Sequence, residues 1–95
     1  MDINKILGST IRLKMLEFLS GNENLAIMEL VRLVNSNHNE VDRHLRILED
    51  EELIVQHFLG RKRIIRLNYK NKKTQLLLEV VSDLKNSGRV ISQIH

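Results

Sequence analysis

Apolar residues recur along the first quarter of the chain at the spacing of helices. Residues 1–8 carry a short pattern of this kind, and residues 9–22 carry a second one that is apolar on more than one side, as in a central core helix. Ser9 stands where the second pattern begins, and its hydroxyl can accept a free backbone N–H of the first turn. We therefore predict a short first helix that ends near Gly8 and a central second helix that ends at residues 20–22.

Two further helical patterns follow, with a polar break between them. The third helix is predicted from apolar residues at i, i+3, i+4 and i+7, which are Ile27, Leu30, Val31 and Val34. Residues 35–37 (Asn-Ser-Asn) end it, because asparagine tolerates the left-handed conformation of a tight turn. Asn37 and Glu40 have capping-box spacing for a fourth helix, which runs into the acidic residues 49–52. Its expected buried stripe is Val41, Leu45 and Leu48.

The hydrophobic period changes after residue 52. Residues 53–59 and 62–68 are rich in Ile, Val and Phe, and they flank Gly60-Arg61, a loop that fits a type II′ β-hairpin. A two-stranded ribbon alone is marginally stable in water, so this hairpin must pack against the helices. Helical spacing resumes at residues 70–86, and an apolar segment at residues 89–95 ends the chain.

This order of helices, tight turn and hairpin predicts a winged helix-turn-helix. The expected fold class is mainly α with a small β-hairpin wing, made of about five helices and a two- to three-stranded antiparallel wing. No linker or internal repeat divides the chain, so residues 1–95 are predicted to form a single domain. In this architecture the fourth helix enters the major groove of DNA, and the hairpin contacts the neighbouring backbone or minor groove.

The distribution of charge agrees with nucleic-acid binding better than the total charge does. Lys and Arg outnumber Asp and Glu by only 15 to 12, for a net charge of +3. No acidic residue occurs between Glu52 and Glu79, however, and this gap holds a block of basic residues. They are Arg61, Lys62, Arg63, Arg66, Lys70, Lys72 and Lys73. We therefore predict double-stranded DNA as the partner.

Candidate DNA contacts lie on the outward face of the fourth helix and at the hairpin tip. They are Asn37, His38, Asn39, Asp42, Arg43, Arg46, Arg61, Lys62 and Arg63. Asn39 suits bidentate bonding to adenine, and Arg43 can contact base or phosphate. Asp42 can accept from cytosine, although an ion pair with Arg46 at i, i+4 is the favoured interpretation.

Two polar residues are interpreted as structural. His44 lies beside the buried stripe of the fourth helix, so we expect a partly buried, hydrogen-bonded imidazole. Arg12 lies within the central second helix and is predicted to be an ion-pair partner in the structure rather than a DNA contact.

The sequence resembles ArsR-type winged helix-turn-helix transcription regulators over roughly residues 5–68. The resemblance rests on residues 6–16 (ILGSTIRLKML), on residues 41–48 (VDRHLRIL) as recognition helix, and on the wing residues 53–54, 60–61 and 65–67. It implies a homodimeric transcription repressor whose first and last helices form the dimer. Glu52 stands where the family commonly has a glycine that closes the recognition helix, and a left-handed backbone there would be strained.

The metal-site residues of this family are absent. Many members hold thiolates on the helix before the recognition helix, but the matching residues 25–29 (LAIME) contain Ala and Met. Others bind zinc through His on the last helix, and residues 70–86 contain no His. We therefore predict no metal and no cofactor, and the sequence leaves any small-molecule effector open.

The first and last helical segments carry more apolar residues than one face against the core requires. A surplus of this kind marks an interface, so residues 70–95 are predicted to be a dimerisation element. The predicted dimer contacts are Ile3, Ile6, Leu77, Val80, Val81, Leu84 and Ile91. A two-fold homodimer also suits a palindromic operator.

Several other classes of protein are disfavoured. An enzyme is not expected, because no nucleophile–base pair, phosphate-binding glycine loop or metal-ligand spacing occurs. Cysteine is absent, and neither a membrane-spanning run nor a signal-peptide pattern is present, so we predict a cytoplasmic protein. The alternative function is a winged-helix protein–protein interaction module, which predicts an uncharged wing. Binding of single strands or RNA would require exposed aromatic residues, and only Phe18, Phe58 and Tyr69 occur.

Overall fold

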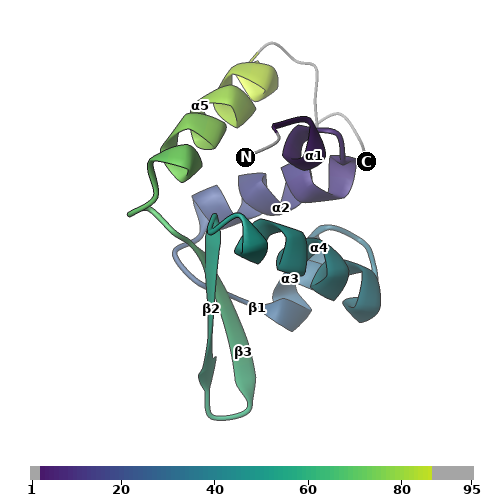
Figure 1. Ribbon diagram of the computed structural model, residues 1–95. Helices are drawn as coiled ribbons and strands as arrows, with labels where there is room; N and C mark the ends of the chain where they lie inside the picture. The colour runs from purple at the N-terminus through teal and green to yellow at the C-terminus, as the bar shows by residue number, and fades with distance from the viewer. Residues whose placement is uncertain (1–2, 87–95) are drawn as a thin grey trace.

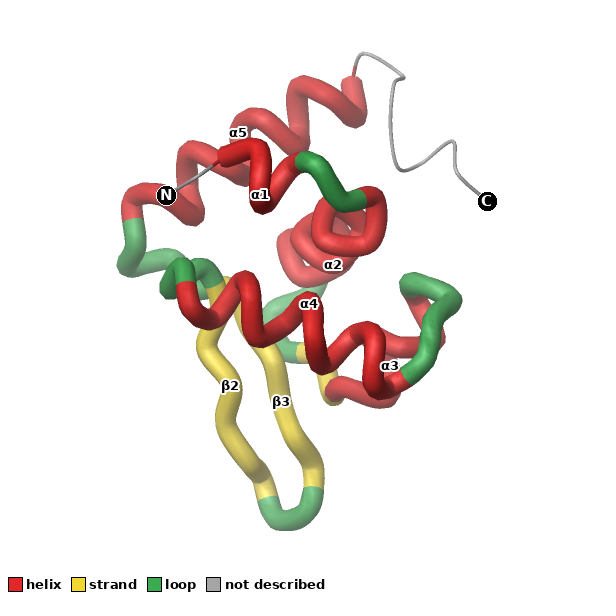
Figure 2. Tube along the Cα trace, turned by 45° about the vertical axis from the view of Figure 1, so that its right-hand side comes forward, coloured by secondary structure: helices red, strands yellow, loops and turns green. Residues whose placement is uncertain are grey.

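A computed structural model describes residues 3–86 and confirms the predicted fold class: five helices and a three-stranded antiparallel sheet. The helices and strands, in chain order, are α1 (Ile3–Leu7), α2 (Thr10–Gly21), β1 (Leu25–Ala26), α3 (Ile27–Leu33), α4 (His38–Asp50), β2 (Ile54–Leu59), β3 (Lys62–Leu67) and α5 (Lys72–Asn86). In Figure 1, α2 lies at the centre, with α5 on one side and α3 and α4 on the other. The β2–β3 hairpin, the wing, projects away from the helices, and Figure 2 shows the same arrangement from a second direction.

The core forms where the apolar faces of these elements meet. Its largest fully buried side chains come from every helix and from the sheet: Ile6, Met15, Leu16, Leu19, Leu30, Val41, Leu45, Leu48, Leu53, Ile65 and Leu77. The predicted stripe of α4 is part of it, since Val41, Leu45 and Leu48 are each fully buried. Burial of this stripe fixes which face of α4 points outward.

The sheet has the order β1-β3-β2, so β3 is its central strand. Leu59 pairs with Lys62, which leaves Gly60 and Arg61 as a two-residue loop. Gly60 has φ +62°, whereas Arg61 is not among the described residues with positive φ, as a type II′ turn requires. The predicted turn is therefore confirmed. Leu25 and Ala26, expected on the helix before the recognition helix, lie instead in β1, where they pair with Ile65 and Ile64.

The helix ends follow the predicted capping residues. Ser9 Oγ accepts a hydrogen bond from the backbone N of Arg12 at 3.3 Å, and Asn37 Oδ1 accepts one from the backbone N of Glu40 at 2.9 Å. Asn35 has φ 55° in the turn between α3 and α4, in the left-handed region predicted for it. These side chains define where α2 and α4 begin, and so set the start of the outward face of α4.

The acidic end of α4 is stabilised by residues that precede α5 and by a lysine in its first turn. Glu52 has φ 59°, the left-handed conformation that its place in the sequence suggested. Its carbonyl oxygen accepts hydrogen bonds from Asn68 Nδ2 at 3.0 Å and from Asn71 Nδ2 at 2.9 Å. Lys73 Nζ also lies 4.0 Å from Glu51 Oε2. The asparagine bonds satisfy a carbonyl group that the helix leaves unpaired, and the lysine reduces the charge repulsion there.

Candidate nucleic-acid interface

The outward face of α4 presents the polar residues predicted for it. His38, Asn39, Arg43 and Arg46 are exposed along the helix. Asn37 is also exposed, but its side-chain oxygen serves as the helix cap. This face is therefore a row of hydrogen-bond donors and acceptors on a helix that is anchored by its opposite, fully buried side.

The three predicted cations of the wing differ in their exposure to solvent. Arg61 and Lys62 are exposed at the tip, whereas the side chain of Arg63 is only 21% exposed. Arg63 pairs with Phe58 of β2 and stands two residues before the fully buried Ile65. Residues two apart in a strand share a face, so Arg63 lies on the face of the ribbon that turns toward the protein. The tip cations are thus free to approach a phosphate backbone, and Arg63 reaches back toward α4.

Arg63 joins the wing to α4 through a polar cluster, the α4–wing bridge, which consists of Asp42, Arg46, Gln56 and Arg63. Arg63 Nη1 lies 2.6 Å from Asp42 Oδ1, and Arg63 Nε donates to Gln56 Oε1 at 2.6 Å. Arg46 Nη2 lies 3.2 Å from Asp42 Oδ2, so the predicted pair at i, i+4 is formed. The hydrogen bond from Arg63, together with the charges of Arg63 and Arg46, lowers the pKa of Asp42. Asp42 is therefore held as a carboxylate between two guanidinium groups.

A groove of about 660 Å³ separates the wing from the first turns of α3 and α4. It is lined by Ala26, Ile27, Met28, Glu29, Arg32, His38, Phe58, Arg61, Lys62 and Arg63. Positive charge predominates, because the lining has four cationic residues, Arg32, Arg61, Lys62 and Arg63, and one carboxylate, Glu29. The carboxylate of Glu29 also accepts a hydrogen bond from the backbone N of Ala26 at 3.1 Å. The groove is therefore suited to an anionic partner such as a DNA backbone.

Sequence reasoning missed three residues of this surface: Arg32, Gln56 and Phe58. Arg32 is four residues after the exposed Met28, so helical spacing could have placed both on the outer face of α3. Gln56 and Phe58 alternate with His57 along β2, and strand alternation could have placed them on the face of Arg63. Phe58 is 69% exposed.

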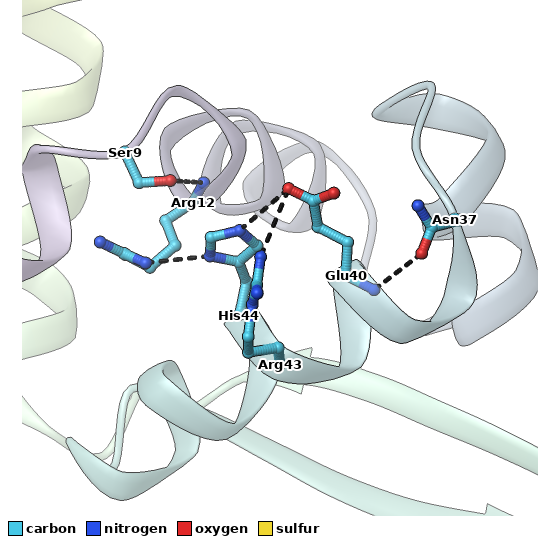
Figure 3. Close-up of polar contacts among 6 residues, drawn as sticks. All are labelled: Ser9, Arg12, Asn37, Glu40, Arg43 and His44. Carbon is cyan, nitrogen blue, oxygen red and sulfur yellow. Dashed lines mark hydrogen bonds and ion pairs between the residues drawn. The ribbon is translucent and has the colours of Figure 1, made fainter.

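A second polar network ties α4 to the centre of the molecule (Figure 3). Arg12 Nη1 donates to His44 Nδ1 at 2.9 Å, and Arg12 Nη2 donates to the backbone carbonyl of Lys5. His44 Nε2 lies 3.7 Å from Glu40 Oε1, and Arg43 Nη2 lies 3.6 Å from the same oxygen. Because Nδ1 accepts from a guanidinium, the imidazole is neutral and carries its proton on Nε2. Burial, followed by the charges of Arg12 and Arg43, lowers the pKa of His44.

This network confirms that His44 is buried and hydrogen-bonded, with only 8% of its surface exposed. Arg12 is structural, as predicted, although the partners described for it are an imidazole and a backbone carbonyl rather than a carboxylate. The network fixes α4 to α2 through the contact between Arg12 and His44.

The residues predicted at a dimer contact divide into two groups. Ile6, Leu77 and Val81 are at most 3% exposed within the single chain, so their place is in the core and they have almost no surface left for a partner. Val80 and Leu84 are half-buried on α5, and Leu76 of the same helix is 61% exposed. Ile3 begins α1, while Ile91 lies outside the described residues. The apolar surplus inferred from the sequence is thus smaller than expected, because α5 buries one face on α2.

Residues 3–86 were also compared with the requirements of a metal site and of a membrane-spanning helix. Within this range, no three His, Asp or Glu side chains come together as metal ligands would. No helix in it is both long and apolar enough to cross a membrane.

The chain is similar to known bacterial regulators in sequence and in fold. Residues 9–55 match the family described as bacterial regulatory protein, arsR family. No curated protein matches the sequence. Among solved structures, the AntR antimony-specific transcriptional repressor superposes with a TM-score of 0.73 at 21% identity, covering 88% of this chain and 74% of that one.

Two other solved structures show the same fold at higher identity. A MarR family transcriptional regulator from Silicibacter pomeroyi gives a TM-score of 0.71 at 28% identity, covering 90% of this chain and 58% of that one. A predicted DNA-binding transcriptional regulator from E. coli gives 0.70 at 25% identity, covering 90% and 84%. The chain therefore spans less than two thirds of the Silicibacter protein, and most of the E. coli one.

Proposed function

Residues 9–55 match the arsR family of bacterial regulatory proteins, and from this premise we propose that the chain is a transcription regulator that binds double-stranded DNA sequence-specifically. The observation that carries the proposal is the combination of an exposed polar face on α4 with a basic wing tip beside it. A helix of this kind fits the major groove, and flexible cations at a hairpin tip suit phosphates or the minor groove.

The proposed contacts have different roles. Asn39 and Arg43 are the base-reading candidates, since both are exposed on α4. His38 lies at the start of the same helix and lines the groove beside the wing. Arg61 and Lys62 are the phosphate contacts, because they are exposed and sit at the tip. Together they present charge and base-reading groups on one side of the molecule.

The regulator is proposed to act as a homodimer and as a repressor in the cytoplasm. The exposed Leu76 and the half-buried Val80 leave an apolar patch on α5, which supports a contact between two copies. A two-fold dimer presents two copies of α4 to the half-sites of a palindrome. The lack of thiolates at residues 25–29 supports a regulator that does not sense soft metals there.

The alternative, a winged helix for protein–protein contact, is less well supported. Such a module needs an apolar recognition face, whereas the exposed residues of α4 are charged or polar and the wing tip is basic. No described feature of the surface of α4 favours it over DNA.

The test is selection of bound sequences from a random duplex pool, carried out at two salt concentrations. We expect enrichment of a palindrome by the wild-type protein. Arg43→Ala should abolish the enrichment, and Lys72→Ala, which removes an exposed cation on α5, should leave it intact. Binding that depends steeply on salt without any enriched sequence would refute sequence-specific recognition.

A further inference from the structure

Asp42 was a candidate base contact, but its oxygens are already engaged within the protein. One oxygen lies 2.6 Å from Arg63 and the other 3.2 Å from Arg46. Its side chain is 21% exposed, against 69% for Arg43 on the outer face of the same helix. A carboxylate in this position faces the wing rather than the outer surface of α4.

Arg63 is held on two sides. Its Nη1 pairs with Asp42 of α4, and its Nε donates to Gln56 of β2. A planar guanidinium with two fixed acceptors has one orientation, and charge-assisted bonds of this length are stronger than those of neutral groups. The Arg63 and Asp42 side chains are equally shielded, so solvent screens this pair less than an exposed one.

The wing needs such an attachment because its outer half lacks core packing. Ile54, Ile65 and Leu67 are buried near the base of the hairpin, whereas Phe58 and Leu59 near the tip are 69% and 62% exposed. Two strands without packing are marginal in water. Among the described ion pairs, that between Asp42 and Arg63 is the one that joins α4 to the wing.

The carboxylate of Asp42 also lowers the net positive charge of the groove between α4 and the wing. Arg46 and Arg63 line a groove between α4 and the wing with Asp42 and Glu49. With Asp42 ionised, two cations that could each bind phosphate are partly neutralised, and a negative charge stands between them. A DNA backbone approaching this groove meets less attraction than it does at Arg61 and Lys62.

We propose that Asp42 is a positioning and specificity-determining residue. It holds the wing at a set distance from the recognition helix before DNA arrives, and it suppresses non-specific phosphate binding by Arg46 and Arg63. The suppression of phosphate binding rests on the proposed function. The positioning of the wing does not, because it concerns the free protein.

The first arm of the test measures the wing without DNA. Asp42→Asn keeps the size of the side chain and removes its charge. We expect amide hydrogen exchange in residues 57–64 to accelerate roughly tenfold while exchange in α2 is unchanged, since only the attachment of the hairpin is weakened. Arg63→Gln should have the same effect, and adding Asp42→Asn to it should have little more. Equal wing exchange in the wild type and in both variants would overturn the positioning role.

The second arm measures binding to a random duplex and to the selected site. Asp42→Asn should raise affinity for random DNA and steepen the log–log salt slope by about 1 to 2, as freed arginines reach phosphates. The ratio of specific to random affinity should fall by about tenfold, whereas Asp42→Glu, which keeps the charge, should preserve the salt slope. A loss confined to one base pair of the site would show that Asp42 reads a base and would overturn the proposal. If the wild type selects no sequence, the proposed function fails, while the exchange experiment still decides the positioning role.

Discussion

Glu52 is a non-glycine residue in the left-handed region, and replacing it with glycine should stabilise the protein. Its φ is 59°, its side chain is exposed, and it follows Glu51, the C-cap of α4. The left-handed conformation costs an L-residue about 1–2 kcal/mol, and a carboxylate near the negative end of a helix adds about 0.3–1 kcal/mol. Glycine removes both costs.

Glycine also increases the entropy of the unfolded chain, which opposes this gain by about 0.4–1 kcal/mol. The net stabilisation expected for Glu52→Gly is therefore about 1 kcal/mol. For a domain of this size that corresponds to a rise in Tm of about 4–8 °C. The hydrogen bonds from Asn68 and Asn71 go to the backbone carbonyl of residue 52, so the substitution leaves them in place.

Thermal and urea unfolding followed by circular dichroism measure this difference. Glu49→Gly is the matched control, because the same side chain is removed from an exposed position inside α4. There glycine should destabilise by about 1 kcal/mol. If Glu52→Gly lowers Tm as much as Glu49→Gly does, the strain argument is wrong and the left-handed residue costs the fold nothing.

Three further predictions concern His44, the DNA contacts and the dimer. Since the folded-state pKa of His44 is lowered, the unfolded chain binds the extra proton, and the free energy of unfolding should fall as pH drops below about 6.5, the ordinary value. The groups facing this imidazole are Arg12 of α2 and Glu40 and Arg43 of α4. Urea unfolding measured from pH 7 to pH 5 should show a free energy of unfolding that falls with pH, and His44→Gln should remove this dependence whereas His57→Gln should retain it. Arg61→Ala should weaken binding to all duplexes similarly and reduce the salt slope by about 1, whereas Asn39→Ala should cost about 1–3 kcal/mol on the selected site alone; equal losses on every sequence would show that α4 is not the reader. Sedimentation should give twice the monomer mass at micromolar concentration, and Leu76→Glu should shift it toward monomer while Met28→Glu, an exposed apolar residue of α3, should not; a monomeric wild type would contradict the dimer proposal.

The local features of the fold could be predicted from neighbouring residues alone. The stripe of α4, the Asn35 turn, the Ser9 and Asn37 caps and the Gly60-Arg61 loop each depend on residues within a few positions of one another. Helical periodicity, capping chemistry and turn conformation act over that range, so a single sequence contains their causes. The exposed polar face of α4 followed from the same periodicity.

Contacts between distant residues were decided by the tertiary structure. Asp42 contacts Arg63, and Arg12 contacts His44, because packing of the core brings α4 against the wing and against α2. The two residues of each pair are far apart in the sequence, so no rule of helix or strand periodicity predicts either contact. β1 is two residues long, too short to show an alternating pattern, and exists through its pairing with β3. The apolar pattern predicted that Ile6, Leu77 and Val81 lie at a dimer contact, whereas they are buried in the core of the single chain. The pattern could not separate the two, because an apolar side chain leaves water equally well against its own core or against a second copy. Only the packing of α1 and α5 on α2 assigned these residues to the interior. It leaves Leu76 exposed and Val80 half-buried on α5, whereas Leu84 packs against the core.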